Sequence, residues 1–185
     1  MRWDRLFDDL EARFEAEQRA EADGELAELI RAEYAGVSLV DRLRAQLGGR
    51  VGWWLREAAT FDAELIELGK DWVLLRRAQV ELLVPLAAVV GLRGLARPAS
   101  AGSGPLARRL AIGSVLRRLA RDRVEVSMRL VGAGGHGEVV GTIDRVGADH
   151  LDVAEHPSGT FRRADQVVQV RTVPLAAVVW VAVHA

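Results

Sequence analysis

The chain has 185 residues, of which 50% are hydrophobic and 28% are charged, and its net charge is −1. This composition supports a packed core and argues against wholesale disorder. Because the sequence contains no cysteine, it excludes disulfides, thiolate metal sites and cysteine nucleophiles, and it fits a cytoplasmic location. No apolar run approaches the roughly 18 residues that a membrane span needs, so no membrane partner is expected.

Residues 1–36 are predicted to form an acidic amphipathic helix. The segment carries 11 Asp and Glu residues against five Arg, and its large apolar residues recur with helical spacing. Aromatic side chains on such a stripe need a covering surface, either within the chain or on a partner. We therefore expect an interface that includes Trp3, Phe7, Leu10 and Phe14.

The heptapeptide VPLAAVV occurs at residues 84–90 and again at 173–179, and it marks an internal repeat. In each copy, the proline is expected to end a strand, and one helical turn and a further strand follow. A short helical pattern opens each copy, with Ser38 and Ser114 as the expected N-caps. Alternating apolar residues then predict strands at 51–55, 61–65 and 72–76, and at 124–130, 139–143 and 150–154.

Four segments follow from this pattern. The N-terminal helix occupies residues 1–36, and the first copy occupies 37–95. A stretch rich in Pro, Gly, Ser and Ala makes 96–112 a linker. The second copy occupies 113–185, with longer loops around 132–137 and 156–166.

Helix, three strands and a strand–turn–strand corner form an order that resembles the small SH3-like barrel, and above all its Sm-like form. The most specific piece is Val139-x-Gly141-x-Ile143 followed by Gly147-x-Asp149, which is similar to the first Sm motif. The resemblance implies an α+β fold in which the N-terminal amphipathic helix precedes two Sm-like, SH3-like small β-barrels. Each barrel would be preceded by a short helix. The layout also resembles uncharacterised helix-plus-two-barrel proteins of GC-rich bacteria.

The Sm family binds RNA through an asparagine after its second strand and an Arg-Gly pair near its fifth. Trp72 and His150 stand at the first of these places here, and Ala-Ala-Val at the second. The family's RNA-binding residues are therefore not carried over to this chain.

Basic residues concentrate between positions 91 and 123, which hold eight Arg and one acidic residue. Such a cluster would grip the phosphates of a nucleic acid. Alternatively, it is a solvated helix face or is paired with the acidic N-terminal segment. The candidate residues are Arg108, Arg109, Arg117, Arg118, Arg121 and Arg123.

Two further tryptophans indicate an interface. If Trp53 points inward, then Trp54 points outward, at a place where the repeat suggests Ser127 in the second copy. Trp180 lies in VVWVAV, a strand apolar on both faces, which must be covered by the other barrel, the N-terminal helix or a partner subunit.

No arrangement of residues predicts catalysis. The glycine-rich stretch 132–137 leads into a strand rather than a helix, so it lacks the geometry of a phosphate loop. The four histidines lack helical metal-pair spacing, and neither a metal nor a cofactor is expected. We therefore expect a non-catalytic binding or scaffold protein, a homo-oligomer or the ligand of a protein partner, assembling through the N-terminal helix and the barrel edges. The alternative is an RNA- or DNA-binding protein that uses the arginine cluster.

Overall fold

The computed structural model describes residues 18, 24–25, 28–29, 31–57, 60–95, 110–132, 137–160 and 162–183. The chain divides into two compact units, Met1–Ser38 and Leu39–Ala185. In the first unit, the described residues from 24 to 35 are helical, in agreement with the predicted N-terminal helix. The second unit is of the α+β class and contains both copies of the repeat.

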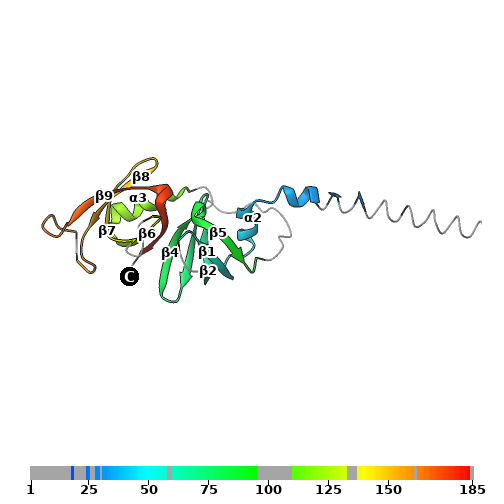
Figure 1. Ribbon diagram of the computed structural model, residues 1–185, viewed down its shortest axis with the longest axis horizontal. Coiled ribbons are helices and arrows are strands. Elements are labelled where there is room, and N and C mark those ends of the chain that lie inside the picture. Colours follow the sequence, from blue (N-terminus) through cyan, green and yellow to red (C-terminus); the bar gives the residue numbers. More distant parts are fainter. Residues whose placement is uncertain are drawn as a thin grey trace, which may run out of the picture. The chain divides into compact units, whose positions relative to one another are not determined.

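The second unit is built from two similar series of elements (Figure 1). The first series consists of α2 (Leu39–Arg44), β1 (Arg50–Leu55), β2 (Phe61–Leu68), β3 (Trp72–Arg77), β4 (Val80–Pro85), the single 3-10 turn η1 (Leu86–Ala88) and β5 (Val89–Arg93). The second series consists of α3 (Ile112–Asp122), β6 (Glu125–Leu130), β7 (Glu138–Val146), β8 (His150–Glu155), β9 (Gln169–Pro174), η4 (Leu175–Ala177) and β10 (Val178–Val183).

The ten strands found among the described residues belong to one antiparallel sheet, in the order β5-β1-β2-β3-β4-β10-β6-β7-β8-β9. The prediction of two small barrels is not confirmed, because the sheet is continuous and is not closed. The repeat is nevertheless visible in the strand order, since each half places its fifth strand beside its first, followed by its second, third and fourth. The halves join because β10 pairs with β4 as well as with β6.

The heptapeptides adopt the same backbone path, as the repeat predicts. Pro85 has φ −61° and ψ 135°, and Pro174 has φ −60° and ψ 136°. Each proline ends a strand, a 3-10 turn of Leu-Ala-Ala follows, and a strand resumes at the next valine. The expected longer loop is also present in the second copy: residues 156–168 connect β8 to β9, whereas Ala78 and Gln79 alone connect β3 to β4.

The tight turn between the second and third strands depends on glycine in both copies. A Cβ atom on Gly69 would lie 2.1 Å from Nε1 of Trp72, and one on Gly147 would lie 2.6 Å from the ring of His150. The absence of a side chain therefore lets the residue three positions later fold back over the turn.

Two details of the second copy correct the sequence analysis. Ser114 is not the N-cap of α3, because the helix begins at Ile112 and Ala111 occupies the cap without a side-chain hydrogen bond. A carboxylate oxygen of Asp71, in the first copy, instead accepts a hydrogen bond of 2.7 Å from the backbone N–H of Ile112. A backbone N–H group at the start of α3, which has no partner within the helix, is thus hydrogen-bonded by a residue of the first copy.

The structure also aligns β1 with β6 differently from the sequence analysis, by a shift of two residues. Trp53 lies opposite Leu92, and Met128 lies opposite Val181, the counterpart of Leu92 in the heptapeptide alignment. The counterpart of Trp54 is therefore Arg129 and not Ser127. A shift of two preserves which side chains point inward, so strand alternation cannot detect it.

The core has two parts, which meet where β4 and β10 pair. Trp53 is fully buried in the first part, and Met128 is fully buried in the second. Trp54 is 54% exposed, which confirms the predicted inward and outward orientation of this pair. Val179 and Ala182 of β10 belong to the first part of the core, whereas Trp72 and Leu83 of the first copy belong to the second part.

Candidate interaction surfaces

The junction between the copies is the one strand-to-strand interface that the structure shows between them. In this antiparallel pair, Ala182 lies opposite Leu82, and Val181 lies opposite Leu83. All four side chains are buried, as is Val179, which lies where the pairing of β10 with β6 is irregular. Burial of apolar area on both sides stabilises the junction through the hydrophobic effect.

Polar contacts anchor the start of α3 to the β2–β3 turn of the first copy. Trp72 Nε1 donates a hydrogen bond of 2.9 Å to the carbonyl oxygen of Leu110, and the backbone N–H of Lys70 donates one of 3.1 Å to the same oxygen. Together with the bond from Ile112 to Asp71, these contacts fix the beginning of the second copy on the first.

Trp180 lies at this junction and not at an outer surface. It is half-buried and packs against the first part of the core. The sequence left open whether the other copy, the N-terminal helix or a partner covers this strand, and the first copy provides cover.

The outer side of β5 is one end of the sheet, and it pairs with no strand among the described residues. Val90, the counterpart of the buried Val179, is 50% exposed. Trp54 lies opposite Gly91 on the neighbouring strand and is also exposed. A shallow hollow beside the strand is lined by Leu39, Leu92 and other residues. We call this surface, formed by Leu39, Trp54, Val90 and Leu92, the β5 edge.

The other end of the sheet, the outer side of β9, carries polar side chains at the positions that are apolar in the junction. Arg171 and Thr172 replace Leu82 and Leu83. The Arg171 guanidinium donates a hydrogen bond to the Glu155 carboxylate, and the Thr172 hydroxyl donates one of 2.7 Å to Asp152 Oδ1. We call this surface, formed by Asp152, Glu155, Arg171 and Thr172, the β9 edge.

At the β9 edge, Glu155 and Arg171 stabilise each other's ionised form. Partial burial raises the pKa of Glu155, but hydrogen bonds from Arg171 and Gln169 outweigh burial and bring this pKa below its ordinary value. The same carboxylate raises the pKa of Arg171 through its hydrogen bond and its charge. Another strand docking here would have to desolvate a formed ion pair.

The basic surface lies on α3 and just after it. Arg117, Arg118 and Arg121 are exposed on the helix, and Arg123 is exposed at its C-cap, in the left-handed conformation with φ 51°. Arg118 Nε lies 3.7 Å from Asp122, one turn further along, a separation at which an exposed pair contributes little. Arg108 and Arg109 lie outside the described residues.

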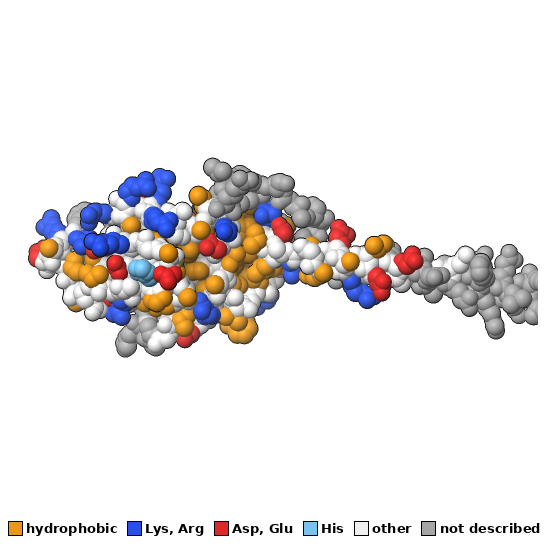
Figure 2. All heavy atoms as spheres, turned by 90° about the horizontal axis from the view of Figure 1, so that it is seen from above, with side chains coloured by type: hydrophobic (Ala, Val, Ile, Leu, Met, Phe, Trp, Pro, Cys, Tyr) orange, Lys and Arg blue, Asp and Glu red, His pale blue; other side chains and the backbone are white. Residues whose placement is uncertain are grey.

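Figure 2 shows Lys and Arg side chains gathered over the end of the sheet unit that belongs to the second copy. Hydrophobic side chains form a broad area nearer the first copy on the same face. On this face, the second unit therefore presents a basic area and a separate apolar area.

The described histidines have partners within the protein. Both ring nitrogens of buried His156 are bonded, Nε2 at 2.9 Å from the Thr142 hydroxyl and Nδ1 at 3.1 Å from the Pro157 carbonyl. His150 Nδ1 lies 2.8 Å from Asp149 and lowers the pKa of that carboxyl through the hydrogen bond and the ring charge. Within the described ranges, no three His, Asp or Glu residues form a group that could hold a metal ion. His136 and His184 lie outside these ranges.

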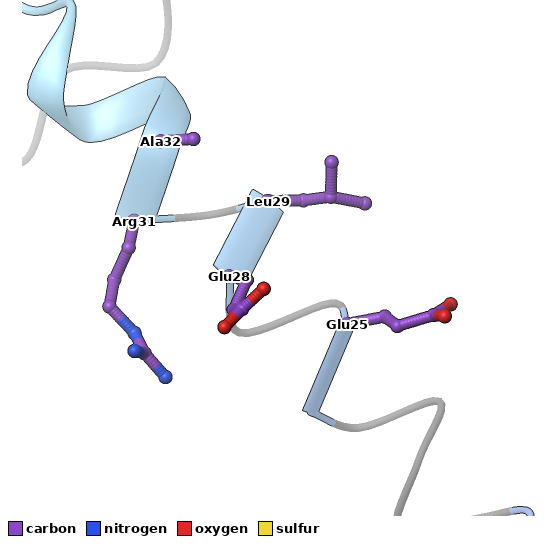
Figure 3. A pocket seen from close by; sticks show the side chains of 5 residues that line it. All are labelled: Glu25, Glu28, Leu29, Arg31 and Ala32. Carbon is purple, nitrogen blue, oxygen red and sulfur yellow. The ribbon is translucent and has the colours of Figure 1, made fainter.

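The N-terminal helix exposes apolar side chains in its described part. Glu25, Leu29 and Ala32 project to one side, whereas Glu28 and Arg31 project to the other (Figure 3). Leu29 is 67% exposed. These five residues line a shallow depression on a single helix, not an enclosed cavity. The interface residues predicted nearer the N-terminus, Trp3, Phe7, Leu10 and Phe14, lie outside the described residues.

Comparison of the chain with protein-family models, with curated proteins and with solved structures found no match. In the part of the chain that the structure describes, no helix has the length and apolar character to cross a membrane. What the surfaces bind is therefore inferred from their own chemistry.

Sequence reasoning did not identify the residues that make the junction on the first copy. Leu82, Leu83 and Val84 form an apolar run on both faces of a strand, the same signal that drew attention to Trp180. Had the same reasoning been applied to both copies, it would have predicted that these two apolar strands pair with each other. Nothing local indicates the role of Asp71, whose partner follows 41 positions later.

Proposed function

We propose that this protein is a non-catalytic binding or scaffold protein that assembles with protein partners, including copies of itself. Its acidic N-terminal helix and the free edge of its sheet provide the binding surfaces. The observation that carries the proposal is the exposure of apolar side chains at both places. Leu29 on the helix and Val90 and Trp54 on the sheet are each at least half exposed.

At the β5 edge the apolar side chains of Leu39, Val90 and Leu92 line one hollow, and apolar surface that lies together in this way marks interaction sites. The repeat supports the same reading, because the counterpart of Val90 is a buried contact residue in the junction. The Sm-like resemblance of each copy supports a binding module, although the sheet is open.

The assembly is tested on the full chain. We expect the native protein to have at least twice the 20.2 kDa mass of one chain, and the combination of Phe7→Glu and Leu29→Glu to lower the mass. Charge on the apolar stripe would have to be desolvated in a helix interface. Sedimentation over a range of concentrations measures the mass. Arg31→Glu is the control, because Arg31 projects away from Leu29. A native protein that stays at the mass of one chain contradicts assembly.

The second candidate function is binding of RNA or DNA, which the exposure of four arginines on and beside α3 favours. Such residues neutralise phosphates and release counterions, so affinity depends on charge rather than on base sequence. The net charge of −1 does not oppose this function, because the basic residues are locally concentrated.

For this candidate, we expect Arg117→Ala, Arg118→Ala and Arg121→Ala together to weaken binding equally for all sequences. The slope of log K against log salt should fall by roughly 2.7, since each phosphate contact contributes about 0.9 on duplex DNA. Titration at several salt concentrations measures both quantities. The matched control removes the same charge from the first copy through Arg76→Ala, Arg77→Ala and Arg93→Ala, all at exposed positions. If the native chain binds neither RNA nor DNA at low salt, this candidate is excluded.

A further inference from the structure

We infer that the β5 edge is a homodimer contact in which β5 pairs antiparallel with β5 of a second copy across a two-fold axis. This inference rests on the proposed function and names the partner of one of its two surfaces. Four features of the sheet carry it: the junction, the exposed β5 edge, the polar β9 edge and the register that the side chains permit.

The junction shows how the fifth strand of a copy packs when another strand pairs with its outer side. Val179 and Ala182 of β10 become buried against the first copy, and the strand completes a backbone ladder with β4. β5 has the same preceding turn and the same Val-Val start, but its outward residue Val90 is half exposed. An unpaired edge with apolar side chains is a template for another strand.

The β9 edge is a poor partner for β5, which disfavours head-to-tail addition of copies. In the junction, Ala182 lies opposite Leu82. The repeat counterparts of these residues are Arg93 on β5 and Arg171 on β9. If β5 paired with β9 in the same register, the two arginines would therefore lie directly opposite each other. Like charges at opposed positions destabilise a strand pair. Asp152 and Thr172, bonded to each other, would also be covered.

A two-fold axis avoids these costs. If it passes beside Gly91, then Val90, the unpaired residue at the irregular position of β5, comes next to Leu92 of the second copy, and the two Arg93 side chains lie apart on either side of the axis. Arg93 keeps its hydrogen bond of 3.1 Å to Asp62 on its own chain. Trp54 lies over Gly91, where a Cβ atom would come within 3.2 Å of the indole, so the two tryptophans would cover the centre of the contact. Closed two-fold dimers are also the commonest symmetric assembly.

The test uses two matched substitutions in the full chain. Val90→Lys places a charge on the β5 edge, and Val170→Lys places the same charge on β9, where the valine is 58% exposed. Both positions are exposed, so both variants should fold, and far-UV circular dichroism checks this. We expect sedimentation to show a lower mass for Val90→Lys over concentrations at which Val170→Lys matches the native chain.

Cross-linking determines the geometry, because the chain has no cysteine of its own. With a short bis-maleimide, we expect Val90→Cys alone to give covalent dimers and Val170→Cys alone to give none. Mixed dimers formed only when the two variants are combined would instead show head-to-tail pairing and overturn the inference.

A mass that falls with Phe7→Glu and Leu29→Glu but not with Val90→Lys would overturn the inference while leaving the proposed function intact. A monomeric native chain would overturn both.

Discussion

Replacement of Trp53 by alanine is expected to lower the free energy of unfolding by about 3–5 kcal/mol, the usual cost of emptying a large aromatic site in a core. Trp53 is 0% exposed and lies in the first part of the core beside Leu65 and Leu75. β1 lies between β2 and β5, with Phe61 and Leu92 opposite Trp53, so the cavity cannot collapse without moving backbone. Urea denaturation followed by far-UV circular dichroism measures the loss without relying on the tryptophan removed.

The adjacent residue provides the control. Trp54→Ala should cost much less, within about 1 kcal/mol, because the side chain is 54% exposed and removal leaves no closed cavity. Trp53→Phe should fall between the two, since it keeps most of the packing and removes an indole N–H that is buried without a hydrogen-bond partner. Equal losses for the two alanine variants would contradict the orientation of β1.

Ala182→Arg is expected to destabilise the second unit by about 3–5 kcal/mol, as an uncompensated buried charge does. Ala182 is 2% exposed and lies between Leu82 on β4 and Ser127 on β6. Because β10 pairs with both strands, the loss should be shared by both copies. We expect a single unfolding transition shifted to lower denaturant concentration, observed both by tryptophan fluorescence and by circular dichroism.

The reverse exchange at the free edge is the matched control. Arg93 is the counterpart of Ala182, and Arg93→Ala should change the free energy of unfolding by no more than about 0.5 kcal/mol. Its ion pair with Asp62 is largely exposed to solvent, so the pair contributes little. If Ala182→Arg is tolerated as well as Arg93→Ala, then the copies do not share the strand ladder described above.

Local patterns predicted the elements well, because the signals that produce them are local. Strand alternation is a property of neighbouring residues, and it correctly placed Trp53 inside and Trp54 outside. The fixed φ of proline and its missing N–H likewise ended both strands at Pro85 and Pro174. The exposed arginines of α3 also lie where the helical spacing put them.

Contacts between distant residues account for what the sequence did not predict. A repeat suggests two units, each of which covers its own apolar side chains. In the structure, however, Leu82 and Leu83 are covered by β10, a strand almost 100 positions later. The expected N-cap at Ser114 was wrong because Asp71 supplies the acceptor from the other copy. Which apolar edge is paired and which remains free depends on side chains that become neighbours only after folding.

The place of β10 in the sheet has a consequence for synthesis on the ribosome. It follows the other nine strands of the described sheet, yet β4 and β6 both pair with it. Until it emerges, β4 of the nascent first copy is paired with β3 alone, and its other edge, with Leu82 and Leu83, is open, a state prone to aggregation. Completion of the fold therefore waits for translation of residues 178–183, and slow elongation just before them would lengthen the period in which chaperones are needed.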